Sequence, residues 1–149
     1  MTQTTPMQHA LKEAVKATNC GEVPIGAVLV DGQGNIVASA HNLTETNNDP
    51  TAHAEIMAIR MRCQGVGAPR LPDHDLYVTL EPCAMCAAAI AGARIRRLYF
   101  GAYDPKGGGV DHGPRIFTQA TINHKPDVYG GIDEGACAAV LQEFFKERR

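Results

Sequence analysis

The chain has 149 residues, of which 44% are hydrophobic and 20% are charged, and its formal net charge is −2. This length and composition argue against a disordered chain and predict a single domain, residues 1–149, that buries roughly two-thirds of its unfolded surface. The slightly acidic balance argues against general polyanion binding. The longest apolar stretch, eight residues at 84–91, is too short to span a bilayer.

The cysteine content gives an expectation about the compartment. The first six residues contain neither the basic region nor the apolar core of a secretion signal. Five cysteines in a chain without such a signal favour a reducing compartment, where thiols bind metals more often than they form disulfides. We therefore expect a cytoplasmic protein without a membrane segment.

Predicted helices and strands alternate along the first half of the chain. Thr5 and Pro6 have the pattern of an N-cap followed by proline at the first helical position, and apolar residues then recur at helical spacing as far as Cys20. Strands at 25–30 and 36–39 flank a turn rich in glycine, aspartate and asparagine, which predicts a hairpin. After a polar loop, Thr51 is the expected N-cap of a helix over about 52–63.

The second half continues the alternation. A buried-type strand at 76–80 leads directly into a helix over 83–91, and another strand follows at 97–101. Residues 104–109 contain three consecutive glycines and are expected to be a flexible loop. A short strand at 127–129 and an amphipathic helix at 133–146 complete the chain. Strands that alternate with helices predict an α/β protein with helices layered on a central sheet.

Two motifs at predicted helix starts combine side chains that bind metals. His53 and Glu55 stand at one helix start, and Cys83 and Cys86 stand at another. Cysteines at i and i+3 project from one helical face, so both sulfurs can reach one metal ion, and a helix N-terminus favours their thiolate forms. One imidazole and two thiolates leave the fourth position of a tetrahedral zinc ion open, as a catalytic site requires.

Glu55 is expected to transfer protons. Catalytic zinc lowers the pKa of water to roughly 7, and a carboxylate two residues from the imidazole can accept the released proton. Glu55 would then protonate a ring nitrogen and the leaving ammonia in a hydrolytic deamination. Cys-x-x-Cys alone is also typical of redox pairs and structural zinc sites, but its combination with His-x-Glu and a preceding proline is specific. The other cysteines, Cys20, Cys63 and Cys137, are expected to be small core residues.

The pattern His-x-Glu followed by Pro-Cys-x-x-Cys is a signature of zinc-dependent base deaminases. The chain resembles the cytidine-deaminase-like superfamily and, within it, the bacterial tRNA adenosine deaminase family, over nearly its whole length. Residues 49–60 and 76–86 carry the superfamily resemblance, whereas 93–97, 101–106 and 123–124 are more typical of the narrower family. The resemblance implies a three-layer α/β/α fold with a mixed five-stranded sheet, a homodimer, and conversion of the wobble adenosine of an arginine tRNA to inosine.

The resemblance also implies a set of site residues. His53, Cys83 and Cys86 would bind one zinc ion per subunit, and Glu55 would be the general acid and base. The residues expected to bind the base or flanking nucleotides of a tRNA anticodon stem-loop are Asn42, Ala54, Leu80, Glu81, Asp104 and Lys106. Candidate RNA contacts in the basic segment and the C-terminal helix are Arg94, Arg96, Arg97, Phe145, Arg148 and Arg149.

Some features leave the substrate open. Residues 92–125 hold six basic against two acidic side chains, which can steer a nucleic acid or lie in solvent without a ligand. Tyr103 stands where the family often has arginine or another polar residue, and His41 where tryptophan is common. An aromatic ring at Tyr103 can stack on a nucleotide or simply cover the loop.

Two other functions share parts of this pattern. A metabolic deaminase that acts on free guanine, cytosine or a nucleoside has the same zinc motif but less need of the basic stretch. A structural zinc module for protein interaction would leave Glu55 idle and would require a fourth protein ligand. No residue stands at a plausible spacing to provide that ligand.

Overall fold

Residues 4–148, which the computed structural model describes, form five strands, four α-helices and one 3₁₀ helix. In chain order these are α1 (Pro6–Asn19), β1 (Gly26–Val30), β2 (Ile36–His41), α2 (Ala54–Val66), β3 (Asp75–Leu80), α3 (Ala84–Gly92), β4 (Arg97–Ala102), η1 (Ile116–Thr118), β5 (Asp127–Tyr129) and α4 (Glu134–Glu147). No helix among the described residues has the length and apolarity needed to cross a membrane.

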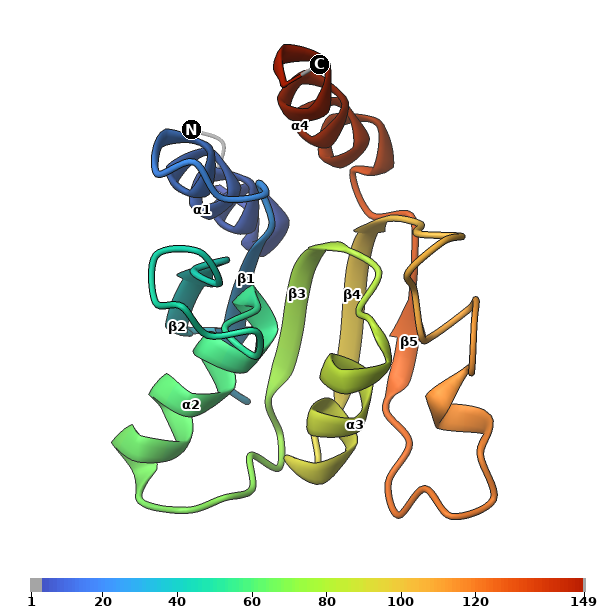
Figure 1. Ribbon diagram of the computed structural model, residues 1–149. Helices are drawn as coiled ribbons and strands as arrows, with labels where there is room; N and C mark the ends of the chain where they lie inside the picture. The colour runs from blue at the N-terminus through green and yellow to red at the C-terminus, as the bar shows by residue number, and fades with distance from the viewer. Residues whose placement is uncertain (1–3, 149) are drawn as a thin grey trace.

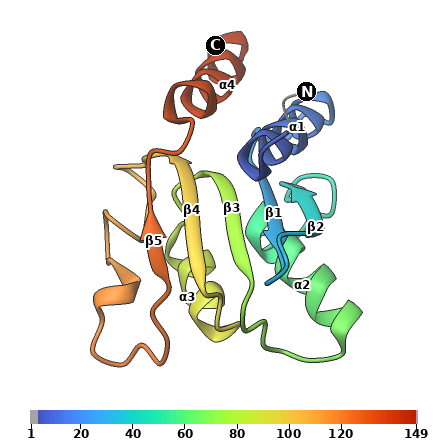
Figure 2. The same cartoon turned by 180° about the vertical axis from the view of Figure 1, so that it is seen from behind.

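The five strands form one mixed sheet in the order β2-β1-β3-β4-β5 (Figure 1). β1 is antiparallel to both β2 and β3, whereas β3, β4 and β5 run parallel to one another. Helices α2 and α3 cover one face, and α1 and α4 pack against one end of the other face (Figure 2). This arrangement is the three-layer α/β/α architecture with a mixed five-stranded sheet that was expected.

The main core lies between the sheet and the α2–α3 layer. Alternate residues of β3 and β4 point into it, and the alanine-rich sequence of α3 lets that helix approach the strands closely. Burial of each large apolar side chain contributes about 1.5–3 kcal/mol relative to exposure. The fully buried large apolar residues of this core are Leu29, Leu71, Leu76, Val78, Ile90, Ile95, Leu98 and Phe100.

The first helix begins where the sequence predicted. The Thr5 hydroxyl accepts a hydrogen bond from the Gln8 backbone at 3.2 Å, and the Gln8 side chain accepts one from the Thr5 backbone at 2.9 Å. This reciprocal capping box satisfies two backbone donors that a helix start leaves unpaired.

Helix α1 also packs closely on β1. Gly26 of β1 lies so close to the Ala10 carbonyl that any side chain there would collide with the helix backbone.

The second helix begins later than the sequence predicted. Thr51 is not its N-cap, because Asp49 accepts hydrogen bonds from both the Thr51 backbone, at 2.9 Å, and the Thr51 hydroxyl, at 2.7 Å. Such a turn is a local alternative to helix capping. Helix α2 therefore begins at Ala54, and its N-cap position is taken by His53.

Three tyrosines stack across the α1–α4 face of the sheet. Tyr77, Tyr99 and Tyr129 occupy paired positions on β3, β4 and β5. Their ring centroids lie 4.4 Å and 5.0 Å apart, with interplanar angles of 5° and 18°. Cross-strand aromatic pairs of this kind stabilise strand register.

Candidate active site

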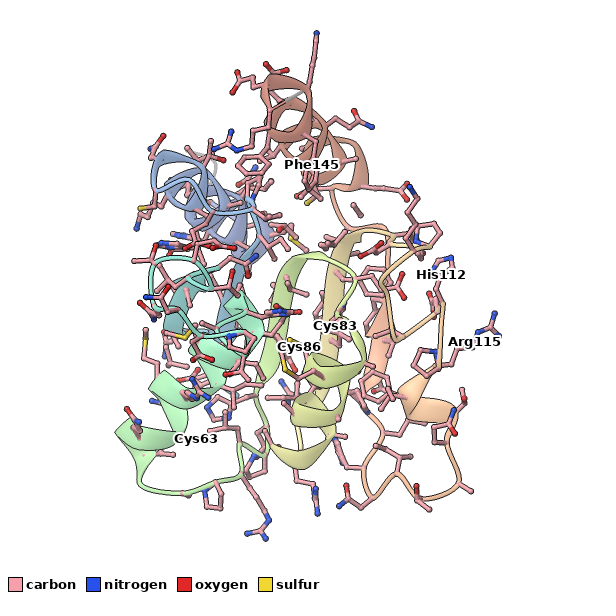
Figure 3. All side chains as sticks on the ribbon, in the orientation of Figure 1. Cys63, Cys83, Cys86, His112, Arg115 and Phe145 are labelled. Atoms are coloured by element: carbon pink, nitrogen blue, oxygen red, sulfur yellow. The ribbon has the colours of Figure 1, made fainter. Side chains whose placement is uncertain are left out.

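The N-terminal ends of α2 and α3 bring the predicted metal ligands together. His53 is the N-cap of α2 and Cys83 is the N-cap of α3, and neither side chain makes a capping hydrogen bond. Cys86 lies in the first turn of α3, on the same side as Cys83 (Figure 3). The two cap side chains are therefore free for a ligand, and both helix N-termini favour negative charge at this point.

The distances fit a zinc ion. His53 Nδ1 lies 3.6 Å from Cys83 Sγ and 3.5 Å from Cys86 Sγ. Tetrahedral zinc with Zn–S near 2.3 Å and Zn–N near 2.0 Å separates its nitrogen and sulfur ligands by about 3.6 Å. Among residues 4–148, no fourth histidine, cysteine, aspartate or glutamate belongs to this group. The donor set thus has the three-ligand composition of catalytic rather than structural zinc sites.

Glu55 is buried beside this group. Glu55 is only 4% exposed. Burial raises the pKa of its carboxyl to about 7, and the negative charge of Cys83 also raises this pKa. The hydrogen bond between the two thiols lowers the pKa of Cys83 to about 4 and raises the pKa of Cys86. A divalent cation at this point would favour the ionised forms of all three groups.

A pocket of about 230 Å³ opens onto the group. Pockets for drug-sized ligands usually measure about 300–1,000 Å³, so this volume suits a smaller ligand such as a single base. Leu80, Glu81 and Asp104, which were predicted to bind substrate, lie in its wall, whereas Ile25 and Gly107 were not predicted. The complete lining is Ile25, His53, Glu55, Leu80, Glu81, Cys83, Asp104 and Gly107.

Asn42 is fixed by the start of α2. Its Oδ1 accepts a hydrogen bond from the Ala54 backbone at 3.0 Å, and the residue is 6% exposed. This bond leaves the amide NH₂ group as the part of the side chain that can donate to a ligand. Asn42 and Ala54 are thereby adjacent to the metal-ligand group, although neither lines the pocket itself.

Glu22 holds the loop that follows Asn42, a role that no local pattern in the sequence indicates. Its buried carboxylate accepts hydrogen bonds from the Thr46 backbone and hydroxyl, both at 2.6 Å, from the Glu45 backbone at 3.2 Å and from the Thr44 hydroxyl at 3.4 Å. Burial raises the pKa of Glu22, but the hydrogen bonds from Thr46 outweigh this and hold it below its ordinary value.

The glycine-rich loop after β4 differs from the flexible segment that the sequence predicted. Asp104 Oδ1 accepts a hydrogen bond from the Gly107 backbone at 3.0 Å, which closes a turn, while Lys106 is exposed. The loop backbone also donates several hydrogen bonds to the buried Glu81 carboxylate. The glycine content predicted a mobile loop. The hydrogen bonds to Glu81 were not foreseen, because they join residues more than twenty positions apart in the sequence.

The structure shows the contacts of the two residues that depart from the family pattern. The Tyr103 ring packs edge-on against Phe100, with centroids 5.1 Å apart, and against His112, with centroids 6.2 Å apart. It also lies beside Gly130 and is 41% exposed, so stacking on a nucleotide stays a prediction. The His41 ring Nδ1 lies 3.1 Å from Glu13 on α1, which ties the end of β2 to that helix.

The predicted arginine contacts are not brought to the pocket. Arg96 makes a bidentate contact of 3.0 and 3.1 Å with Asp75, and Arg97 lies 3.7 Å from the same carboxylate. Asp75 begins β3, whereas the pocket lies beyond the other end of that strand. Arg94 donates to the Ala91 carbonyl at the end of α3. These contacts favour structural roles, and an RNA contact for the three arginines stays a prediction.

The C-terminal helix is separate from the metal-ligand group. Figure 3 shows Phe145 on α4, well apart from Cys83 and Cys86. Phe145 is 51% exposed, and the Arg148 guanidinium lies 3.8 Å from the centroid of the neighbouring Phe144 ring. Arg149 lies outside the described residues. RNA binding by this helix also stays a prediction.

Comparison with known proteins agrees with this geometry. The family model for the cytidine and deoxycytidylate deaminase zinc-binding region matches residues 1–102. The fold and the three-ligand site are those of the zinc-dependent deaminases, and the chain belongs to this class.

Relatives define the family more narrowly. The tRNA-specific adenosine deaminase of Agrobacterium fabrum (strain C58) is 58% identical over 143 residues, which cover 96% of this chain and 93% of that protein. A solved structure from work on A-to-I editing by tRNA:A34 deaminases at the wobble position of transfer RNA has a TM-score of 0.89 and 58% identity, and covers 91% of this chain and 98% of that one. The chain belongs to the tRNA-specific adenosine deaminase family.

A guanine deaminase from Bacillus subtilis is less similar. Its structure has a TM-score of 0.63 and 42% identity, and the match covers 69% of this chain and 66% of that one. The lower coverage and TM-score favour the adenosine deaminase family over the free-base deaminases.

Proposed function

We propose that this protein hydrolytically deaminates the wobble adenosine of a tRNA, giving inosine and ammonia. The observation that carries the proposal is the buried Glu55 carboxylate, which shares a small pocket with a three-ligand metal group. Membership of the tRNA-specific adenosine deaminase family supports the choice of substrate. Arginine tRNA is the expected substrate from the sequence resemblance.

We assign His53, Cys83 and Cys86 as ligands of one zinc ion per subunit. When bound, the ion supplies a nucleophile at neutral pH by lowering the pKa of water. Glu55 accepts a proton from the attacking water, delivers it to N1 of the adenine, and passes the second proton to the amino group that leaves C6 as ammonia. The Asn42 amide offers a donor for orienting the base.

A base in an anticodon loop enters the pocket at a low cost in free energy. Moving a base out of a stack costs a few kcal/mol in a duplex and least when the base is already unpaired. The exposed Lys106 beside the pocket can contact a phosphate of the flanking nucleotides. A tRNA substrate is also consistent with the cytoplasmic location that the cysteine content predicted.

Glu55→Gln separates catalysis from metal binding. Glutamine has nearly the same shape but transfers no proton, so the variant should keep its zinc and lose turnover by at least about a hundredfold, a typical contribution of general acid–base catalysis. The assay measures inosine formed in an arginine-tRNA anticodon stem-loop, with free guanine, cytosine and adenosine as parallel substrates. Turnover of a free base with an unchanged stem-loop would reject the tRNA substrate.

We also infer a homodimer, formed through the outer surface of α2 and α3. These helices contact each other on one face of the sheet and leave three large apolar side chains exposed, namely Met61, Val66 and Met85. Exposed large apolar side chains on neighbouring helices are candidates for a subunit interface. Light scattering should give twice the mass of the chain, and Met61→Glu should give the monomer mass. A wild-type monomer at micromolar concentration would contradict the inference.

A further inference from the structure

The loop from Asp104 to His112 has two contacts with the reaction site. Asp104 and Gly107 line the pocket. Gly109 donates a backbone hydrogen bond to the Pro82 carbonyl at 2.8 Å and passes against the backbone of Cys83 and Ala84. The position of this loop therefore sets both the shape of the pocket wall and the surroundings of one expected zinc ligand.

The Glu81 carboxylate joins the two ends of this loop. Its side chain is 0% exposed. It accepts backbone hydrogen bonds from Asp104 at 3.0 Å, Val110 at 3.2 Å, Asp111 at 2.9 Å and His112 at 3.2 Å. The carboxylate is therefore the acceptor on which the loop is assembled.

His112 contributes the side-chain hydrogen bond to Glu81. Its Nδ1 lies 2.8 Å from Glu81 Oε1, so the proton shared in this bond is on Nδ1 when the carboxylate accepts it. The imidazole also packs edge-on against the Tyr103 ring, which itself packs on Phe100 of β4. His112 is thus held between a buried carboxylate and an aromatic ring anchored to the sheet, while its side chain stays 33% exposed.

The glycines of the loop show that this arrangement requires close contact. A Cβ at Gly108 would collide with the Glu81 carboxylate, and a Cβ at Gly109 would lie 2.5 Å from the Ala84 backbone nitrogen. The loop therefore reaches Glu81 and the start of α3 only because its backbone carries no side chains at these two positions. Its observed shape is specified by these contacts and by the hydrogen bonds to Glu81.

We propose that Glu81 and His112 form a clip that holds the 104–112 loop in its substrate-binding shape, with His112 as a positioning residue for RNA binding. This role rests on the proposed tRNA deamination only for the measurement of KM; the effect on the loop itself does not depend on it. His112 does not line the pocket, and its side-chain hydrogen bond is to Glu81. Loss of the His112 side chain leaves the four backbone hydrogen bonds to Glu81 in place. The 104–112 loop then becomes more mobile but stays attached to Glu81.

The test compares three variants at the same loop. His112→Ala removes the side-chain donor. His112→Asn restores it, because the asparagine amide nitrogen occupies nearly the place of Nδ1. Asp111→Asn is the control, since the Asp111 carboxylate makes no hydrogen bond or ion pair within residues 4–148, and its backbone donor is retained.

Two measurements are made on each variant. In the first, His112→Ala should raise KM for the tRNA stem-loop about tenfold, the factor that corresponds to 1.4 kcal/mol, with kcat changed by less than about threefold. In the second, the amides of Asp104, Val110, Asp111 and His112 should exchange with deuterium about tenfold faster in His112→Ala. His112→Asn and Asp111→Asn should resemble the wild type in both measurements.

The outcomes separate the clip from a merely structural histidine and from the proposed function. Unchanged KM and exchange in His112→Ala would overturn the clip, and so would a raised KM that His112→Asn does not restore. Unprotected Val110 and Asp111 amides in the wild-type protein would overturn it without any variant. A wild-type protein that leaves the stem-loop unchanged would reject the proposed function, whereas the exchange measurements would still decide whether the clip exists.

Discussion

Replacement of Gly109 by alanine tests whether the loop supports the metal ligands. A Cβ at this position would lie 2.5 Å from the Ala84 nitrogen, 2.7 Å from Ala84 Cα and 2.8 Å from the Cys83 carbonyl carbon. All three neighbours are backbone atoms, so rotation of a side chain cannot relieve the contact. Ordinary contact begins near 3.4 Å, which requires a backbone shift of about 0.9 Å and, as overpacking, costs about 1–3 kcal/mol.

The same shift reaches the zinc site. Metal–ligand distances in proteins lie within about 0.2 Å of their standard values. Displacement of the Cys83 backbone by several tenths of an ångström therefore moves its sulfur out of this range. Zinc affinity should therefore fall by about 10–100-fold, as when the support of a metal ligand is lost. Urea unfolding of the metal-free protein gives the stability change, and competition with a chelator gives the affinity.

Gly107→Ala is the matched control. Its Cβ would lie 3.1 Å from Asp104 Oδ2, the end of a side chain that can rotate, and 3.7 Å from the next atom. This variant should unfold within about 0.5 kcal/mol of the wild type and keep its zinc affinity. If Gly109→Ala behaves like Gly107→Ala in both assays, the loop does not support Cys83 and the reasoning is wrong.

Three further predictions follow from other contacts. Glu22→Gln should lower the free energy of unfolding at neutral pH by about 1–3 kcal/mol, because glutamine cannot accept all four hydrogen bonds. The pKa of Glu22 is lowered in the folded protein, so its contribution is present above the ordinary value of 4.5 and the difference from the variant should shrink as pH falls below it. Removal of zinc by a chelator should abolish turnover and lower the melting temperature, and added zinc should restore both. Arg96→Ala should lower the urea midpoint, because it leaves the Asp75 carboxylate without its bidentate partner, and a raised KM for the stem-loop without loss of stability would instead support an RNA contact.

The architecture and the metal-ligand group were predictable because short sequence patterns indicate them. The alternation of apolar residues indicated the helices and strands. His-x-Glu and Pro-Cys-x-x-Cys are short motifs whose combination is a deaminase signature, and the structure brings His53, Cys83 and Cys86 together. The start of α2 was wrong by two residues, since Asp49 uses Thr51 in a preceding turn. Competition between two short-range hydrogen bonds is not resolved by residue preferences alone.

The roles of Glu22 and Glu81 were not predictable in the same way. Each is a buried carboxylate that collects donors from a loop more than twenty residues away. One sequence carries no sign of such a pairing, and Glu81 was expected to contribute only to substrate binding. Charge counting likewise does not reveal that Asp75 pairs with Arg96 and Arg97, whose contact with RNA stays a prediction.

The tyrosine stack decides what optical spectroscopy can report on this protein. The chain has no tryptophan and four tyrosines, and three of the four lie face to face across β3, β4 and β5. Coupling between those rings should dominate the near-ultraviolet circular dichroism and report on the integrity of the sheet. Tyr103 is not part of this stack and precedes the loop beside the pocket, so Tyr103→Phe would identify the part of the ultraviolet emission that comes from this loop without any added label.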